Sequence, residues 1–183
     1  MLFKSTLVAA ATLALTACAS NMMGSSAPMY SQAMLPDAVK VPAGNKVALE
    51  TVGVGQITYE CKVKANMPGQ FEWVFGGPDA RLLDRSGKQV GKYYGPPATW
   101  EAMDGSKFTA TQVAVAPNGA DNIPLQLVKA NPAMGMGAMS GVTYTQRVAT
   151  KGGIAPSSAC GAGNVGAKQV VQYQADYIFY KAS

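Results

Sequence analysis

The sequence predicts an all-β fold, an antiparallel sandwich or barrel with one disulfide. Short runs in which apolar and polar residues alternate recur along the chain, and turn residues separate them. The 20 glycines and 11 prolines suit a fold with many turns. After residue 17, no stretch of about ten residues or more shows the period of a helix.

The chain begins with a segment typical of exported bacterial lipoproteins. Lys4 precedes an apolar run from Leu7 to Leu15, which is too short to span a bilayer as a helix. Leu-Thr-Ala then leads to Cys18, which predicts a signal peptide over 1–17 and a lipid-modified cysteine. A secreted protein without lipid is the alternative, because small residues on both sides of Cys18 also suit an ordinary signal peptidase.

The next residues predict where the mature protein lies. Ala19, rather than aspartate, follows the cysteine, which favours the outer membrane of a cell envelope. Residues 18–40 show no strand or helix period and are expected to form a flexible tether to a β-rich domain over 41–183. Removing Lys4 with the signal lowers the net charge from +5 to +4, and no basic cluster indicates nucleic-acid binding.

Alternation of apolar and polar residues places the strands of the domain. In 56–64, the residues Ile57, Tyr59, Cys61 and Val63 share one face, and the opposite face is polar. Strands are expected over 56–64, 71–75, 80–84, 89–94, 107–115, 123–128, 142–149 and 171–179, turns over 85–88, 104–106 and 117–119, and flexible loops over 129–139 and 161–166.

The cysteines and the absence of histidine limit the chemistry. Cys61 and Cys160 remain beside the lipidated Cys18, and an even pair in an oxidising compartment predicts one disulfide. Two buried thiols or a thiol site are the alternatives, and there is no CxxC redox motif. Without histidine, the chain cannot form a Ser-His-Asp triad, a Cys-His pair or a histidine-ligated zinc site.

Three short motifs resemble a known family. GPPATWE at 95–101, DGS at 104–106 and QRVATKGG at 146–153, together with a closing strand from Tyr173 to Tyr180, resemble the domain-of-unknown-function 3455 family of bacterial and fungal secreted proteins. The similarity covers about residues 41–181. It implies an exported β-rich domain, and it brings no settled activity or cofactor with it.

One group of residues around the first motif is a candidate ligand site. Aromatic rings could stack on a sugar, carboxylates could accept hydrogen bonds and an arginine could donate them. The group consists of Tyr93, Tyr94, Trp100, Glu101, Asp104 and Arg147. In the alternative interpretation the rings close an end of the β domain and Asp104 only shapes a turn, while Glu101 and Asp104 could also serve as the two carboxylates of a glycosidase.

Two further patterns have competing interpretations. Gln146 alternates in phase with Val142, Tyr144 and Val148, which turns its amide toward the core as a structural hydrogen-bonding group, with Arg147 on the opposite, more polar face. Thioethers suit Cu(I), although methionine also fills gaps in cores. The candidate copper ligands are Met134, Met136 and Met139.

The sequence as a whole predicts an envelope lipoprotein whose β domain binds or supports a partner without catalysis and without a cofactor. The expected partners are the membrane, through the lipid, and an envelope glycan or protein. A glycan-acting enzyme that uses carboxylates near Trp100 and a methionine-loop copper protein are the alternatives.

Overall fold

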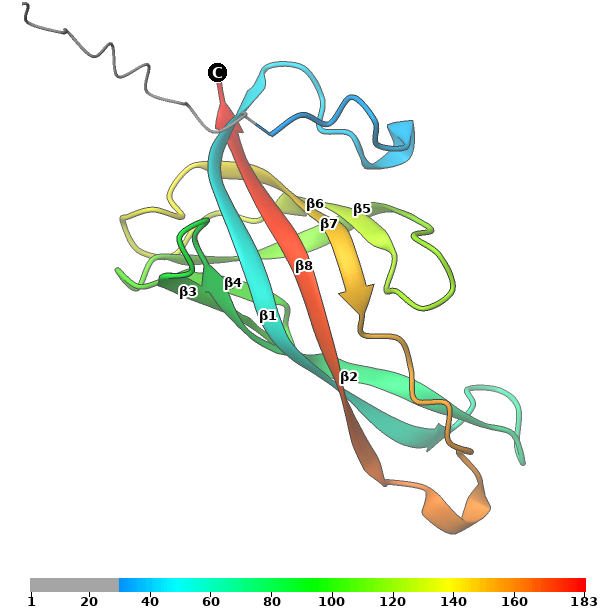
Figure 1. Cartoon of the computed structure of the whole chain (residues 1–183). Coiled ribbons are helices and arrows are strands. Elements are labelled where there is room, and N and C mark those ends of the chain that lie inside the picture. The colour runs from blue at the N-terminus through cyan, green and yellow to red at the C-terminus, as the bar shows by residue number, and fades with distance from the viewer. Residues whose placement is uncertain (1–29) are drawn as a thin grey trace, which may run out of the picture.

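The all-β prediction is confirmed, and the fold is a closed barrel (Figure 1). The computed structural model describes residues 30–183. Each strand pairs antiparallel with the next, and the last strand pairs with the first. The strands are β1 (Asn45–Val63), β2 (Phe71–Leu83), β3 (Gln89–Tyr94), β4 (Thr99–Ala102), β5 (Lys107–Ala116), β6 (Leu125–Ala130), β7 (Val142–Gly152) and β8 (Lys168–Ala182).

β1 and β2 are much longer than the alternation predicts, and β7 and β8 also extend beyond their expected runs. β1 begins at Asn45, eleven residues before the expected run at 56–64, because Gly53 and Gly55 interrupt the apolar pattern while the backbone continues. β2 joins the expected runs 71–75 and 80–84 into one strand through Gly76, where the pairing shifts by one residue against Thr58 and Tyr59. Such a β-bulge bends a strand without ending it.

The interior of the barrel is filled by aromatic side chains. The Tyr93 and Trp100 rings stack with centroids 4.4 Å apart, and Trp100 stacks on Phe108 at 5.3 Å. Tyr177 meets Tyr93 and Trp100 from β8 on the opposite side. A side chain at Gly53 would collide with the Tyr177 ring, so β1 needs glycine here for the rings to fit.

Loops close the barrel interior from both ends. Ile123, at the end of the β5–β6 loop, packs into the core beside Gly153 and Tyr173, and its amide donates to the carbonyl of Gly152 at 2.9 Å. Met139 enters the same core from the β6–β7 loop, at the end where its amide donates to Ser106 Oγ at 3.0 Å. We call this second closure the Met139 plug.

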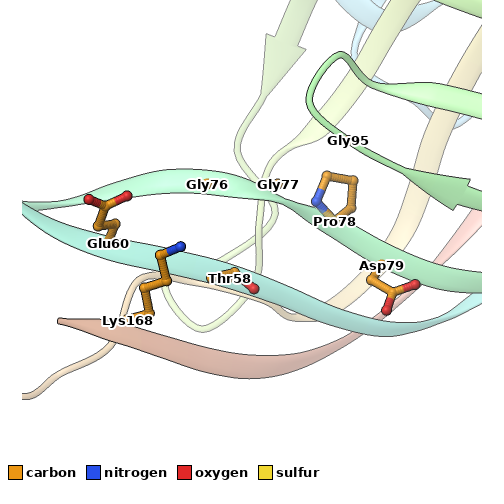
Figure 2. Close-up of a pocket in the computed structure, with 8 residues that line it drawn as sticks. All are labelled: Thr58, Glu60, Gly76, Gly77, Pro78, Asp79, Gly95 and Lys168. Atoms are coloured by element: carbon orange, nitrogen blue, oxygen red, sulfur yellow. The ribbon is translucent and has the colours of Figure 1, made fainter. Parts of the chain in front are cut away.

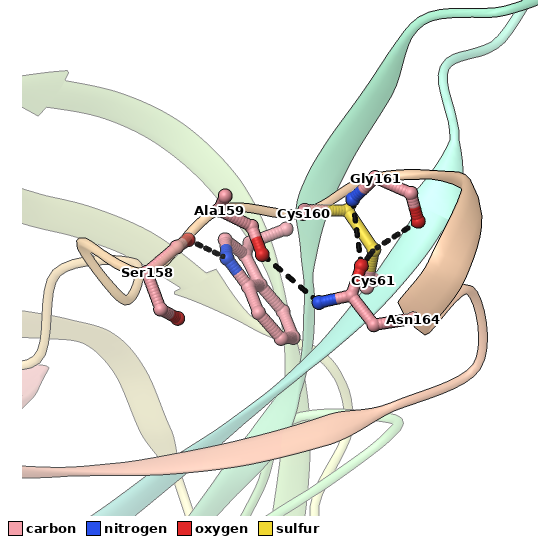
Figure 3. Close-up of a disulfide and its surroundings, with 7 residues drawn as sticks. Cys61, Ser158, Ala159, Cys160, Gly161 and Asn164 are labelled. Carbon is pink, nitrogen blue, oxygen red and sulfur yellow. Dashed lines mark hydrogen bonds between the residues drawn. A yellow bond between two sulfur atoms is a disulfide. The ribbon is translucent and has the colours of Figure 1, made fainter.

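β1, β2 and β8 extend beyond the closed barrel as an arm (Figure 1). The chain after β7 crosses this arm, and the indole of Trp73 donates to the carbonyl of Ser158 at 2.8 Å. The predicted disulfide is confirmed there, since Cys61 is bonded to Cys160 across 99 residues (Figure 3). Asn164 accepts a hydrogen bond from the Gly161 amide at 2.6 Å and thereby holds the loop beside the sulfurs.

The segment before β1 packs on the outside of the barrel. Val39 and Val41 are buried against apolar residues of β5 to β8, which form a second cluster. The 3₁₀ turn η1 (Asp37–Val39) belongs to this segment, so residues 30–40 of the expected tether lie against the barrel. Residues 18–29 lie outside the described part of the chain. We call residues 30–41 the strap.

The strap covers the side-chain amide of Gln146. The predicted assignment of the two faces of β7 is therefore wrong. Gln146 is fully buried, but it faces the strap outside the barrel. Its Nε2 donates to the Val39 carbonyl at 2.6 Å and to Gln32 Oε1 at 3.0 Å, while Tyr180 Oη donates to its Oε1 at 2.8 Å. Arg147 therefore points to the barrel interior, in register with Tyr177, because a second apolar layer reverses which face of β7 is the polar one.

Candidate functional site

A polar hollow lies on the outer face where β1, β2 and β8 run together (Figure 2). Its volume is about 230 Å³. Thr58 and Glu60 face it because they alternate with Ile57, Tyr59 and Cys61, which are buried on the other face of β1. The lining residues are Thr58, Glu60, Gly76, Gly77, Pro78, Asp79, Gly95 and Lys168. We call this hollow the outer pocket.

The first family-like motif builds one wall of the outer pocket. The Gly95 amide donates to the Pro78 carbonyl at 3.2 Å, so the GPP turn lies against the bulge in β2. Gly77 has φ +146°, and a side chain there would collide with the Gly95 carbonyl. The two backbones thus approach each other closely because position 77 is glycine, while a Cβ at Gly95 would lie 3.2 Å from Pro78. The motif has a structural role in shaping the hollow.

The outer pocket brings negatively charged carboxylates and a positively charged ammonium group together. Figure 2 shows Glu60 and Asp79 toward its two ends, with Thr58 and Lys168 between them. Lys168 stands opposite Glu60 in the β1–β8 register, while the Glu60 carboxylate contacts Lys62 Nζ at 3.4 Å. Within residues 30–183, the Asp79 carboxylate has no hydrogen-bond or ion-pair partner, so it is free to accept from a ligand.

Two of the predicted ligand residues lie on the outer face of the next strands. Tyr94 stands opposite Asp79 on β3, and its hydroxyl donates to Glu101 Oε2 at 2.7 Å. Lys92 Nζ lies 3.2 Å from Glu101 Oε1, and Lys107 Nζ lies 3.9 Å from Oε2. The Tyr94 hydroxyl, followed by Lys92, lowers the pKa of Glu101. This carboxylate is therefore held ionised by neighbours within its own sheet.

The other two aromatic residues of the predicted site are not available to a surface ligand. Tyr93 is 5% exposed and Trp100 is 2% exposed, because both point into the barrel. A stacking platform built from Tyr93, Tyr94 and Trp100 does not form, since adjacent residues of β3 face opposite sides of the sheet. The interpretation in which the rings fill the β domain agrees with their placement.

Asp104 serves the Met139 plug. It accepts hydrogen bonds from the Ser106 hydroxyl at 2.5 Å, the Ser106 amide at 2.9 Å and the Ala138 amide at 2.7 Å. These bonds lower the pKa of Asp104, with the Ser106 hydroxyl as the largest cause. The DGS motif therefore fastens a loop of the barrel in addition to making its own turn.

The structure separates the three candidate copper ligands. Met139 is 1% exposed in the core, whereas Met136 is 88% exposed and Met134 is 47% exposed. The Met134 amide and carbonyl pair with Lys107, which fixes this part of the loop to β5. A site that uses all three sulfurs would require the plug to leave the barrel.

Among residues 30–183, Arg147 forms no hydrogen bond or ion pair with the other predicted ligand residues. Its Nε and Nη2 donate to the Pro124 carbonyl at 3.2 and 3.0 Å, so it helps to hold the β5–β6 loop over the barrel. Cys18, the predicted lipidation site, lies outside residues 30–183. Of the predicted group, the structure brings only Tyr94 and Glu101 into direct contact on the surface.

A family model for a protein of unknown function, DUF3455, matches residues 42–181. The chain belongs to the DUF3455 family. The matched region begins just before β1 and ends within β8, so it contains the whole barrel, and the resemblance inferred from the motifs is confirmed. Neither a curated protein nor a solved structure matches the chain.

Sequence reasoning missed the outer pocket of this DUF3455 protein. Thr58, Asp79 and Lys168 are far apart in the chain and none belongs to a motif. The available signal was Gly76-Gly77-Pro78 between two alternating runs, because glycines within a strand often mark a bulge. Which side chains would gather beside the bulge depends on the pairing of β1 with β8, which the sequence does not reveal.

Proposed function

We propose that this protein is a lipoprotein of the cell envelope, anchored through Cys18, whose barrel is a non-enzymatic binding module. The outer pocket would hold a polar group of an envelope glycan, such as one sugar ring. Its chemistry supports this choice, because carboxylates, a hydroxyl and an ammonium group can pair with sugar hydroxyls and amines. A protein partner would be expected to require a larger and more apolar contact.

The observation that carries the binding proposal is the contrast between the two sides of the barrel wall. The inside is packed with Tyr93, Trp100, Phe108 and Tyr177. The outside presents charged groups around a hollow, including Asp79, which has no partner among the described residues. A ligand would thus bind on the outer face and leave the barrel unchanged.

The carboxylates argue for binding rather than glycoside hydrolysis. A glycosidase needs one carboxylic acid whose pKa is raised so that it can donate a proton near neutral pH. The pKa of Glu101 and that of Asp104 are both lowered, and each carboxylate is already bound by neighbouring residues. Neither residue is suited to act as the general acid.

The lipid anchor rests on the N-terminal sequence. Lys4, the apolar run and Leu-Thr-Ala before Cys18 together support processing by a lipoprotein signal peptidase. Several acyl chains on one cysteine bind a membrane nearly irreversibly, at about 0.8 kcal/mol for each buried methylene. Among residues 30–183, no helix is long and apolar enough to cross a membrane.

Replacement of the cysteine tests the anchor. We expect the Cys18→Ser protein to move from the membrane fraction to the soluble fraction of the envelope, or to accumulate unprocessed. The wild-type precursor should accumulate in the presence of a lipoprotein signal peptidase inhibitor. If Cys18→Ser protein is processed normally and stays on the membrane, the anchor is not this cysteine.

A pull-down with insoluble peptidoglycan tests the outer pocket. We expect Asp79→Asn with Lys168→Gln to weaken binding at least about tenfold, because a hydrogen bond to a charged group contributes about 1.5 to 3 kcal/mol. Glu72→Gln with Lys64→Gln is the matched control, since it removes the same two charges elsewhere on the arm. Equal binding by both double variants would contradict a role of the pocket.

A further inference from the structure

Three lysines stand at the end of the barrel where β1 begins and β8 ends. Lys46 and Lys181 lie directly opposite each other in the β1–β8 register. Lys129 lies near the end of β6, in register with Tyr144. None of the ion pairs formed within residues 30–183 involves any of these three lysines. Their charges are therefore not neutralised by a neighbouring carboxylate.

The pairing of Lys46 with Lys181 is unfavourable for the isolated protein. Directly opposite residues of an antiparallel pair share one face of the sheet, and like charges there destabilise the pair. An anion bound over the two ammonium groups would relieve this repulsion.

A shallow groove adjoins the lysines at the same end. Its volume is about 350 Å³, and Lys129 and Tyr144 line it on one side. Asn45, which immediately precedes Lys46, lines it on the other side with Thr143, and the Thr143 hydroxyl donates to Asn45 Oδ1 at 2.7 Å. The groove therefore places amide and hydroxyl groups beside Lys129, while Lys46 and Lys181 stand at the same end of the barrel on the other face of their strands.

The start of the strap lies on β1 near this end of the barrel, and it begins only twelve residues after the proposed anchor at Cys18. The Tyr30 amide donates to Glu50 Oε1 at 3.2 Å, which places the beginning of the strap on β1, about 13 Å along the strand from Lys46. Figure 1 shows the strap and the end of β8 at the same end of the molecule, opposite the arm. Even if fully extended, the chain from Cys18 to Tyr30 spans at most about 40 Å.

We propose that Lys46, Lys181 and Lys129 form a surface that binds the phosphate headgroups of anionic lipids in the membrane that carries the anchor. Two features select this occupant: the limited chain length between Cys18 and Tyr30, and the positive charge that has no ion-pair partner among residues 30–183. The orientation of the barrel relative to the membrane depends on the proposed lipid anchor. The affinity for headgroups is a property of the barrel alone. The arm and the outer pocket would then face away from the bilayer.

Vesicle binding tests the surface without the acyl chains. The processed chain with Cys18→Ser is mixed with vesicles of phosphatidylcholine alone or with added phosphatidylglycerol, and bound protein is measured by flotation. We expect binding only to the anionic vesicles, and it should decrease as salt rises. The triple variant Lys46→Gln, Lys129→Gln and Lys181→Gln should bind about a hundredfold less well, because each surface lysine contributes about 1 kcal/mol.

A matched variant distinguishes this surface from the net charge. Lys62→Gln, Lys64→Gln and Lys151→Gln remove the same charge from the other end of the molecule and should leave binding within about twofold of the parent chain. Equal losses in both triple variants would overturn the proposal, as would binding to neutral vesicles. Complete competition by millimolar inorganic phosphate would assign the lysines to a free anion instead. None of these outcomes depends on whether Cys18 is lipidated in the cell.

Discussion

A single glutamine joins the strap to the barrel. Gln146 is 0% exposed, and the described hydrogen bonds of its side chain go to Gln32, Val39 and Tyr180. A buried polar group that loses its partner costs about 1 to 3 kcal/mol. Gln146 therefore stabilises a contact between two layers that otherwise depends on apolar packing and on the hydrogen bond from the Tyr30 amide to Glu50.

We expect Gln146→Leu to lower the free energy of unfolding by at least about 2 kcal/mol, because the Val39 carbonyl and the Tyr180 hydroxyl lose their partner. Urea unfolding measures this change. Gln172→Leu, an exposed position on β8, is the control and should change stability by no more than about 0.5 kcal/mol. Similar losses in the two variants would indicate that the strap does not depend on the amide.

For single residues, the sequence predicted the chemical role of a side chain better than its position in the fold. The alternation in β7 correctly predicted a buried, hydrogen-bonded Gln146, but it could not show that the strap, rather than the barrel interior, covers it. Tyr93 and Tyr94 are adjacent, and only the strand register decides which of them points inward. The spacing of residues within a motif does not reveal which other segment of the chain, here the strap, will cover a strand.

Among the elements, the Met139 plug depends on a carboxylate. Asp104 holds the Ala138 amide and orients Ser106, whose hydroxyl accepts from the Met139 amide. The lowered pKa of Asp104 means that the folded state prefers the ionised form. This contribution to stability is present above the ordinary pKa of 3.8, and it is lost as the pH falls through the lower pKa of the folded state.

We expect amide hydrogen exchange at Ala138 and Met139 to accelerate at acidic pH beyond the intrinsic effect of pH on exchange, because protonated Asp104 accepts hydrogen bonds poorly. In Asp104→Asn the same amides should exchange rapidly at neutral pH. Exchange at Ile123, at the other end of the barrel, should remain unchanged. Protection of Ala138 that does not depend on Asp104 would contradict this role.

The strands show where alternation succeeds and fails as a predictor. The expected runs are found as strands, although β1 and β2 extend through glycines that break the pattern. β4 was not expected, because Thr99–Ala102 is short and follows two prolines. Its strand conformation comes from pairing with β3 and β5 on both sides, which is a tertiary effect.

For the whole molecule, the disulfide links the arm to the chain that crosses it. Cys61 and Cys160 close a loop of 99 residues, and in the chain-entropy model this closure contributes about 4 to 5 kcal/mol. The sequence predicted this bond from an even pair of cysteines in a chain expected to reach an oxidising compartment. It could not predict that the bond would lie on an extension of the sheet beyond the closed barrel.

We expect Cys61→Ser with Cys160→Ser to lower the free energy of unfolding by several kcal/mol, at most about 5, as measured with urea. Because the bond lies on the arm, the far-UV circular dichroism of the folded protein should change little. Trypsin should cleave the double variant first near Lys151 or Lys168, on either side of the released crossing segment. Early cleavage within the barrel would show instead that the bond holds the whole fold.

The pairing of β1 with β8 also sets an order of events during biogenesis. The strand that begins the domain has its partner at the very end of the chain, since Asn45 pairs with Ala182. The cylinder can close only after β8 has been synthesised and, on the proposed export route, has crossed the inner membrane. Closure of the barrel therefore waits for its last strand, whatever the earlier strands have already formed.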